Sequence, residues 1–341
     1  MSLSVEPMVT HYLVTRRCPL RCSYCGFVRP VRGYNEDAWE HELDFKGKKM
    51  VLETLKRLGS GFVVIMGGEV LLLGDELVEL VRNMNRLGLS YAVQSSSVGW
   101  LMERYFDKLV DAKIMNWTIS FDVLGDSYPD DDVTLKTNEG FKWLLRFKEA
   151  GVRDLVATIT ITHYNLKHVP AMVQFLNRHG IWSYITTLHW SKGHGYDFAS
   201  NIDTIADFLP KPEDRGLWEK VMKALMTMKH EDYLIHNELE WFEMMSKGLP
   251  SMSWRCKYPL LTPVVDSDGT VRTCLHIRGS GKYFIWDLLD NDKISGFLKM
   301  WERDVEEYCK GCDWDCRWHA EYYYERDMIR EGLRAIKHVT E

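Results

Sequence analysis

Short apolar runs alternate with segments of helical period along the first 190 residues of the chain. The apolar runs that have the length of strands are 11–15, 62–66, 91–94, 115–121, 155–162 and 182–188. Apolar residues recur every three or four positions at 46–57, 75–86, 101–112, 139–150 and 166–178, which predicts helices there. This alternation predicts an α/β fold with a parallel sheet of right-handed β-α-β units. The active site of such a sheet lies at the carboxyl ends of its strands, whether the sheet is open or closed into a barrel.

The pattern changes after residue 190. A polar, glycine-containing stretch at 191–200 precedes a predicted helix at 213–230 and a second one at 237–247. From residue 250 onward, two apolar runs at 261–265 and 270–275 flank an Asp-Ser-Asp-Gly turn, which is typical of a β-hairpin. We therefore divide the chain into a core at 8–190, a helical bridge at 191–249 and a C-terminal extension at 250–341.

Composition and charge exclude several classes of protein. Of the 341 residues, 45% are hydrophobic and 27% charged, which excludes intrinsic disorder and favours a packed core. The formal charge of −6 argues against general nucleic-acid binding, because phosphate recognition needs a basic face. No apolar run reaches the roughly 18 residues of a membrane span, and residues 1–10 lack the layout of a signal peptide, so we expect a cytoplasmic protein. In that reducing compartment the eight cysteines are expected to be metal ligands or catalytic thiols rather than disulfides.

Three cysteines lie directly after the first predicted strand. Cys18, Cys22 and Cys25 form a C-x3-C-x2-C motif. Three thiolates on one short loop can hold three irons of a 4Fe-4S cluster and leave the fourth iron open for another ligand. The alternatives are a zinc site completed by a distant ligand and a set of free thiols. Zinc ribbons usually have two C-x2-C pairs separated by a gap, so the spacing favours the cluster.

This motif, with Tyr24 before the third cysteine, resembles the signature of the radical S-adenosylmethionine (radical SAM) superfamily. The resemblance makes Tyr24 an expected SAM-binding residue. The resemblance implies a partial (β/α)6 barrel, similar to a TIM barrel, and an open iron that binds the amino and carboxylate groups of S-adenosylmethionine (SAM). It also implies that one-electron reduction of SAM yields a 5′-deoxyadenosyl radical, which removes a hydrogen atom from the substrate. The partner implied is a reductant of the flavodoxin or ferredoxin type.

Further residues at predicted strand ends resemble the SAM-binding positions of the superfamily. Gly67, Gly68 and Glu69 resemble the GGE(P) motif that holds the methionine amino group, although Val70 replaces the proline. Ser96 lies where many relatives have a Thr-Asn-Gly turn. The remaining expected SAM-binding residues follow the next two strands: Ser120, Asp122, Thr160 and Thr162.

A second cysteine pattern lies in the C-terminal extension. Its C-x12-G-x4-C spacing, followed by C-x2-C, resembles the Twitch and SPASM extensions of radical SAM enzymes, which bind auxiliary 4Fe-4S clusters. Five cysteines are too few for two clusters, so we expect one. Its expected ligands are Cys256, Cys274, Cys309 and Cys312, with Cys316 as a competitor for the last position or a free thiol. The alternative is a zinc knuckle of Cys309, Cys312, Cys316 and His319.

The fate of the substrate radical leaves two alternatives open. In dehydrogenases that resemble this architecture the auxiliary cluster takes the electron of the substrate radical, and we favour this two-electron oxidation. In the corresponding epimerases a cysteine returns a hydrogen atom, a role that Cys316 could fill. His189 ends the sixth predicted strand and is a candidate general base or substrate contact, since imidazole titrates near neutral pH.

The position of Cys18 bears on the substrate class. It lies close to the start of the sequence, which argues against a preceding leader-binding domain of the kind found in many peptide-modifying relatives. We therefore expect a small polar substrate such as an amino sugar or a cyclitol, with modification of a peptide or protein side chain as the main alternative. A non-catalytic iron-sulfur or zinc scaffold is the alternative outside enzymes, and it needs neither an open iron nor the motif at 67–69.

Overall fold

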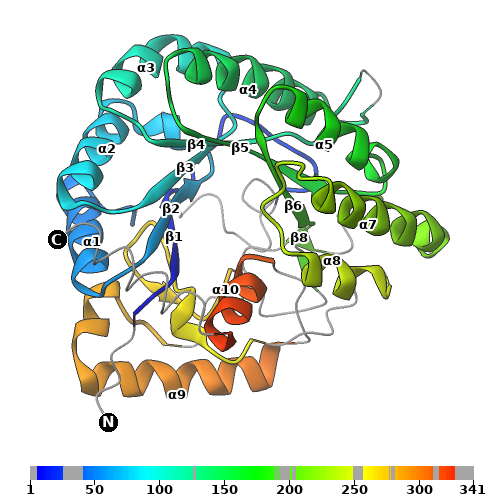
Figure 1. Cartoon of the computed structure of the whole chain (residues 1–341). Helices are drawn as coiled ribbons and strands as arrows, with labels where there is room; N and C mark the ends of the chain where they lie inside the picture. The colour runs from blue at the N-terminus through cyan, green and yellow to red at the C-terminus, as the bar shows by residue number, and fades with distance from the viewer. Residues whose placement is uncertain are drawn as a thin grey trace.

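The computed structural model is built around one curved sheet, and the helices that alternate with its first six strands lie along its outer side (Figure 1). It describes residues 6–25, 41–125, 128–188, 190–191, 200–201, 205–248, 256–275, 277, 281–309 and 315–326, with backbone only at 190–191, 200–201 and 316. The strands of its first half are β1 Val9–Thr15, β2 Phe62–Gly67, β3 Tyr91–Ser95, β4 Asn116–Ser120, β5 Asp154–Ile161 and β6 Trp182–Thr187, each parallel to the next. The helices between them are α1 Phe45–Arg57, α2 Asp75–Leu87, α3 Gly99–Asp111, α4 Asp131–Glu149 and α5 Val169–Arg178. The predicted α/β fold with a parallel sheet is therefore confirmed.

Each outer helix buries one apolar stripe against the sheet. In α2 the buried residues include Leu77, Leu80, Val81 and Met84, which recur at the spacing of one helix face. Gly88 ends α2 in the left-handed conformation at φ 60° and donates its backbone N–H to carbonyls of the last turn. Glycine adopts this conformation without steric cost, so the chain can turn directly into β3.

Helix α4 begins eight residues before the predicted start at residue 139. Asp130 caps it by accepting a hydrogen bond from Val133 N at 3.1 Å. The first two turns of α4 bury Lys136 and Thr137 beside one apolar residue, Val133. A buried face that is mostly polar has no clear apolar period, so the sequence pattern did not reveal this part of the helix.

The bridge covers the free edge of β6. It contains α7 Arg215–His230 and α8 Leu239–Ser246, close to the two predicted helices. The segment between them runs beside β6, where Ser183 and Ile235 form a parallel bridge. The fully buried Asn237 then pairs with Ile185: its Oδ1 accepts from Ile185 N and its Nδ2 donates to Ile185 O, both at 2.7 Å. One side-chain amide thus replaces a residue of a neighbouring strand.

The C-terminal hairpin belongs to the same sheet. Its strands are β9 Val264–Val265 and β10 Val271–Arg272, which pair with each other antiparallel. Strand β9 also lies parallel to β1, so the hairpin extends the sheet beyond β1 in the order β10-β9-β1-β2-β3-β4-β5-β6. The predicted hairpin is present, with strands shorter than the apolar runs at 261–265 and 270–275.

A buried ion network joins the hairpin to β1. Asp266, with 3% of its side chain exposed, accepts a hydrogen bond from Arg16 Nε at 2.8 Å and from Arg272 Nη1 at 2.7 Å. Arg16 Nη2 contacts the same carboxylate. Burial works to raise the pKa of Asp266, but the Arg272 and Arg16 guanidiniums outweigh it and lower this pKa to about 2. The carboxylate is therefore ionised and holds both arginines.

The remaining elements lie mostly after the sixth strand. Two helices that the sequence pattern did not reveal are α9 Asn291–Tyr308 and α10 Asp315–Glu325. The short 3-10 helices are Val70–Leu73, Leu166–His168, Pro212–Asp214, Pro259–Leu261 and Ile285–Leu289, and two-residue strands β7 Trp190–Ser191 and β8 Ser200–Asn201 pair in parallel. Among the helices of the described residues, none has the length and apolar character needed to cross a membrane.

Candidate active site

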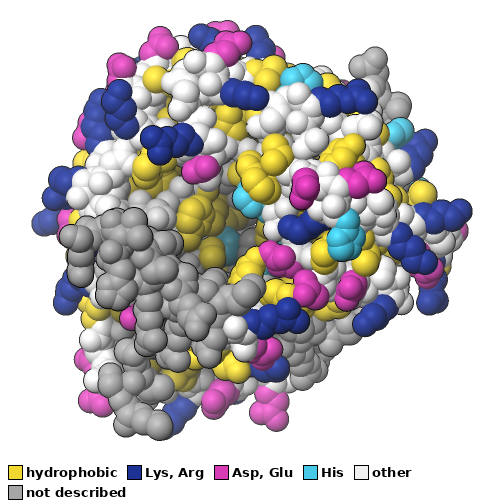
Figure 2. Space-filling view, in the orientation of Figure 1, with side chains coloured by type: hydrophobic (Ala, Val, Ile, Leu, Met, Phe, Trp, Pro, Cys, Tyr) yellow, Lys and Arg dark blue, Asp and Glu magenta, His cyan; other side chains and the backbone are white. Residues whose placement is uncertain are grey.

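A cavity of about 640 Å³ lies on the inner side of the sheet. The face of the molecule in Figure 2 is hollowed at its centre, with hydrophobic and histidine side chains in the hollow. All three cysteines of the first motif line the cavity, together with Tyr24, Gly67, Gly68, Ser96, Ser120 and Thr160. The carboxyl ends of the strands thus bring six of the nine expected SAM-binding residues to one wall beside the cysteines.

The three thiols lie separately along this wall. Cys22 is buried at 6% exposure, and Cys18 and Cys25 are half-buried. Burial raises the pKa of both Cys18 and Cys22 to about 12, so these thiols stay protonated and unreactive without a metal. Within the described part of the chain, no three His, Cys, Asp or Glu side chains converge on one metal ion.

Gly67 and Gly68 let the cysteine loop lie directly on the end of β2. Gly68 N donates to Thr15 O at 3.0 Å, and Glu69 N donates to Arg17 O at 2.8 Å. A Cβ at Gly67 would overlap Thr15 O, and one at Gly68 would overlap Arg17 O. The two glycines are therefore required for the approach of the loop to the sheet.

We expect Gly68→Ala to displace the cysteine loop and to weaken SAM binding at least about tenfold, at a cost of about 1–3 kcal/mol of unfolding free energy. Equilibrium binding of SAM to the anaerobically reconstituted protein measures the first effect, and chemical denaturation the second. Gly216→Ala is the matched control, because Gly216 is exposed on α7 and a Cβ added there would meet no other atom within 4 Å. Equal SAM affinity in the two variants would contradict the role given to Gly68.

Glu69 lies behind the cavity wall. Its fully buried carboxylate accepts hydrogen bonds from Leu71 N at 3.0 Å, Ser95 Oγ at 2.7 Å and Ser96 N at 2.7 Å. Burial raises its pKa, while these donors work in the opposite direction. The carboxylate expected to hold the methionine amino group thus fixes the turn that carries Ser96, and its direct contact with SAM stays a prediction.

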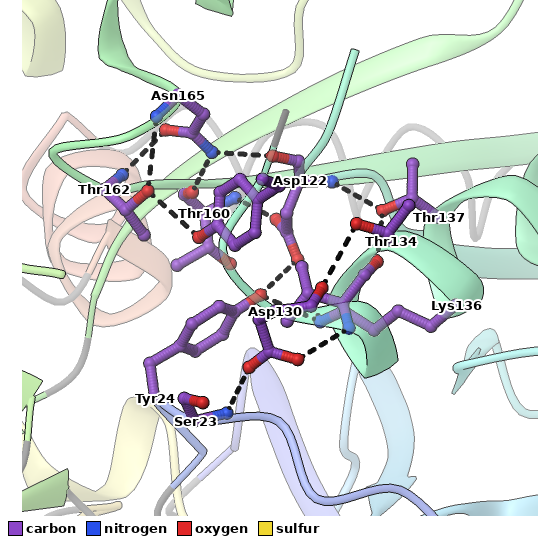
Figure 3. Close-up of polar contacts among 12 residues, drawn as sticks. Ser23, Tyr24, Asp122, Asp130, Thr134, Lys136, Thr137, Thr160, Thr162 and Asn165 are labelled. Carbon is purple, nitrogen blue, oxygen red and sulfur yellow. Dashed lines mark hydrogen bonds and ion pairs between the residues drawn. The ribbon is translucent and has the colours of Figure 1, made fainter. Parts of the chain in front are cut away.

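Tyr24, Asp122 and Lys136 form a buried cluster under the cysteine loop, where their polar atoms point toward one another (Figure 3). The Tyr24 hydroxyl donates to Asp122 Oδ2 at 2.6 Å. Lys136 Nζ lies 2.9 Å from the Tyr24 hydroxyl and 2.8 Å from Asp122 Oδ2. Burial works to lower the pKa of Lys136, but its ion pair with the Asp122 carboxylate acts in the opposite direction, and the pKa is raised. The ammonium therefore stays charged.

Asp122 and Thr162 also lie behind the wall rather than in it. Asp122 is fully buried, and its Oδ1 accepts from Thr160 N at 2.7 Å. Thr162 is fully buried and shares a 3.1 Å hydrogen bond with the Tyr128 hydroxyl. Asn165 binds this region together, because its Nδ2 donates to Asp122 O and Thr160 O (Figure 3). Both predicted residues position the wall, and their direct contact with SAM stays a prediction.

Sequence reasoning missed the contribution of α4 to the cysteine loop. Asp132 Oδ2 accepts from Arg21 N at 2.6 Å, and Asp130 Oδ2 accepts from Ser23 N at 2.5 Å. Lys136 from the same helix reaches the loop at Tyr24. Lys136 lies on the face of α4 that carries the buried Val133 and Gly140, which shows only once the helix is known to begin at residue 131.

The second cysteine region is described in part. Cys256 Sγ lies 3.1 Å from Nη1 of the buried Arg317, whose Nη2 donates to Thr262 O at 2.9 Å. Cys274 Sγ accepts from Ile277 N at 3.2 Å. Cys309 follows the last turn of α9 and is half-buried. His189, Cys312 and the side chain of Cys316 lie outside the described residues, so their predicted roles stay predictions.

His319 is not available as a metal ligand in this structure. Its Nδ1 donates to Asp315 O at 2.8 Å, and its Nε2 accepts from Glu238 N at 3.1 Å. Burial lowers its pKa to about 4, so the ring is neutral and both nitrogens are used. This arrangement argues against the zinc knuckle with His319. Instead, His319 lines the cavity with Asp315 and Tyr323, which lie on the same face of α10.

Residues 12–176 match the Radical SAM superfamily. The chain contains a radical SAM domain. Members of this superfamily are enzymes, and a domain of this kind implies a 4Fe-4S cluster and SAM as cofactors. The radical SAM domain includes the three cysteines of the loop, the two glycines of β2 and the wall formed by β3–β5.

Relatives of the radical SAM domain act on different substrates. The chain is 32% identical over 177 residues to a PqqA peptide cyclase of Bradyrhizobium diazoefficiens, a match that covers 49% of this chain and 43% of the relative. The chain thus spans about two fifths of the length of that relative. It is 29% identical over 302 residues to a GTP 3′,8-cyclase of Staphylococcus saprophyticus, covering 86% of this chain and 83% of the relative. The fold is similar to that of Streptococcus suis SuiB bound to S-adenosylmethionine, with 16% identity, a TM-score of 0.60, and coverage of 84% of this chain and 65% of SuiB.

Proposed function

We propose that this chain is a radical SAM oxidoreductase that binds a 4Fe-4S cluster through Cys18, Cys22 and Cys25. When bound, the reduced cluster and SAM supply a 5′-deoxyadenosyl radical that removes a hydrogen atom from the substrate. The observation that carries the proposal is the position of the three thiols, which line one cavity beside Gly67, Gly68 and the strand ends. In our proposal the core at 8–190 forms a partial (β/α)6 barrel, and a reductant of the flavodoxin or ferredoxin type supplies the electron.

The contacts that hold the cysteine loop and the cavity wall support these residues as a cofactor site. The cysteine loop is held from both sides, by the glycines of β2 and by the N-terminal end of α4. The cavity wall at Ser96, Ser120 and Thr160 presents hydroxyl groups that suit the polar groups of SAM. The wall residues are fixed in turn by buried carboxylates, so the site is formed before any ligand binds.

We further propose that a single auxiliary 4Fe-4S cluster is held in a Twitch- or SPASM-like extension at 250–341, following a bridge at 191–249. Cys256, Cys274, Cys309 and Cys312 are its proposed ligands, with Cys316 as the competing thiol. The buried guanidinium of Arg317 supports this proposal, because its N–H lies 3.1 Å from Cys256 Sγ and could also donate to the sulfur of a cluster ligand.

For the substrate we propose a polar group on a peptide side chain, with a small polar molecule such as an amino sugar or cyclitol as the second candidate. The similarity to PqqA peptide cyclases favours the peptide. In either case we expect the substrate to place a neutral polar group in the cavity. Strands β4, β5 and β6 line the cavity with residues that include Thr118, Thr158 and Thr186, whose hydroxyls can bind such a group. A nucleoside triphosphate is disfavoured, since Lys136 is the one Lys or Arg among the described residues that line the cavity.

The test of the proposed function is cleavage of SAM. Protein reconstituted with iron and sulfide without oxygen, then given dithionite and SAM, is expected to release 5′-deoxyadenosine and methionine. Absence of 5′-deoxyadenosine from protein that carries its iron and sulfide would contradict the proposal and favour a non-catalytic scaffold.

We expect Cys256→Ser to remove the auxiliary cluster alone. Iron and sulfide are then expected to fall from about eight of each per chain to about half, because two four-iron clusters become one. Cleavage of SAM continues, since the cysteine loop is unchanged, whereas product formation from the substrate stops. Quantification of iron, sulfide and 5′-deoxyadenosine checks these results. Unchanged iron content in this variant would remove Cys256 from the ligand set.

The choice between oxidation and epimerisation depends on Cys316. In an epimerase, Cys316→Ala would leave SAM cleavage intact and block return of the hydrogen atom to the substrate radical. In the oxidation that we propose, no hydrogen atom returns, and the proton leaves to a base for which His189 is the candidate. Incorporation of solvent deuterium into the product distinguishes the two reactions.

A further inference from the structure

A buried lysine lies beside the cysteine loop, although the loop needs no lysine to bind iron. Lys136 has 8% of its side chain exposed, and its ammonium lies between the Tyr24 hydroxyl and the fully buried Asp122 carboxylate. Tyr24 stands between Cys22 and Cys25 in the sequence, and Lys136 lines the same cavity as both cysteines. Burying an ammonium is costly unless it is paired, so this arrangement calls for a reason beyond packing.

Two effects of Lys136 follow from its contacts. The first is geometric: with Asp122, it fixes the Tyr24 hydroxyl and so the course of the loop between two of the three cysteines. The second is electrostatic. A positive charge in a buried site acts strongly on nearby charges because little water screens it. Lys136 lines the same cavity as Cys22, so its charge lies on the side of the loop where the proposed cluster would bind.

We propose that Lys136 is a positioning residue that raises the reduction potential of the 4Fe-4S cluster bound by Cys18, Cys22 and Cys25. The inference rests on the proposed function, since it requires the cluster at these cysteines. Reduction adds one electron to the oxidised cluster, and dithionite is the electron source in the experiment below. The added negative charge is stabilised by the buried ammonium. The oxidised cluster carries less negative charge and gains less, so the lysine favours the reduced form.

A redox titration monitored by electron paramagnetic resonance tests this role without SAM or substrate. In Lys136→Met, the ratio of reduced to oxidised cluster is expected to fall at least about tenfold at the potential that half-reduces the parent, which corresponds to a shift of about 59 mV for one electron. Lys142→Met is the matched control, because Lys142 lies on the same helix with its side chain exposed, and its potential should equal that of the parent. Lys136→Arg keeps the charge and is expected to restore most of the potential.

A second variant tests the proposal even if Lys136→Met disrupts the cysteine loop. Lys136→Gln keeps a hydrogen-bond donor but removes the charge, and it is expected to show the same negative shift as methionine. Equal potentials in Lys136→Gln and the parent, with full iron content in both, would overturn the role of Lys136 and leave the proposed function intact. A parent protein that binds no 4Fe-4S cluster would instead contradict the proposed function.

Discussion

Replacing Cys22 by alanine is expected to reduce the release of 5′-deoxyadenosine to the level of a protein-free control. Cys22 supplies one of only three thiolates to the proposed cluster, and its loss leaves the loop with two. The cluster at this site should therefore be lost, and SAM has no electron donor without it. Chromatographic quantification of 5′-deoxyadenosine after reaction with dithionite measures the effect.

Two comparisons make this result specific. Cys316→Ala is the control, because it removes a cysteine without touching the cysteine loop and should leave SAM cleavage at the parent level. Iron content separates loss of a cluster from loss of the fold, since a folded Cys22→Ala protein should keep the auxiliary cluster. SAM cleavage at the parent rate in Cys22→Ala would show that these cysteines do not hold the catalytic cluster.

Asp266→Asn is expected to lower the free energy of unfolding by about 3–5 kcal/mol, the usual cost of breaking a buried ion pair. The substitution keeps the shape of the side chain but leaves the guanidiniums of Arg16 and Arg272 without their shared carboxylate. Because Arg16 lies two residues before Cys18, the same change should loosen the entry to the cysteine loop. Chemical denaturation at neutral pH measures the loss.

The pH dependence of stability gives an independent check on Asp266. Its pKa of about 2 in the folded protein lies below the value of about 3.9 in an unfolded chain, so the ionised form stabilises the fold. This contribution, about 2–3 kcal/mol, is complete above about pH 4 and is lost as the pH falls toward 2. The Asn variant should lack this part of the acid dependence. Asp75→Asn, which removes an exposed partner of Lys108, should leave both measurements unchanged.

The sequence predicted the parts of the fold that depend on local pattern. The six strands and the helices between them follow apolar periods, and residues 12–176 match the superfamily that the cysteine motif indicated. The pairing of β9 with β1 was not predictable, because residues 264–265 pair with a strand some 250 positions away and carry no local mark of it. The buried role of Arg16 was missed for the same reason, since its partner lies in the distant turn at Asp266.

In the candidate site, too, local sequence pattern predicted some features and missed those that depend on the tertiary structure. Sequence spacing identified residues that line the cavity, among them Cys18, Gly68 and Ser120. It could not distinguish these from residues such as Glu69, whose carboxylate is fully buried and holds the wall from behind. Lys136 was missed because it is a charged residue at a buried position of α4, where it pairs with Asp122. Helices are recognised by an apolar period, and a charged residue at a buried position interrupts it.

The pairing of Asn237 with Ile185 has a consequence for the behaviour of the protein during folding. An exposed edge strand offers unpaired backbone groups to other molecules and is a common starting point for aggregation. Here the edge of β6 is covered only when the chain has continued past residue 237. A fragment that ends at the close of the sheet, near residue 190, would leave β6 open. We therefore expect that fragment to self-associate through β6 more strongly than a fragment that extends through α8, since both lack β9 beside β1 and only the first leaves β6 open.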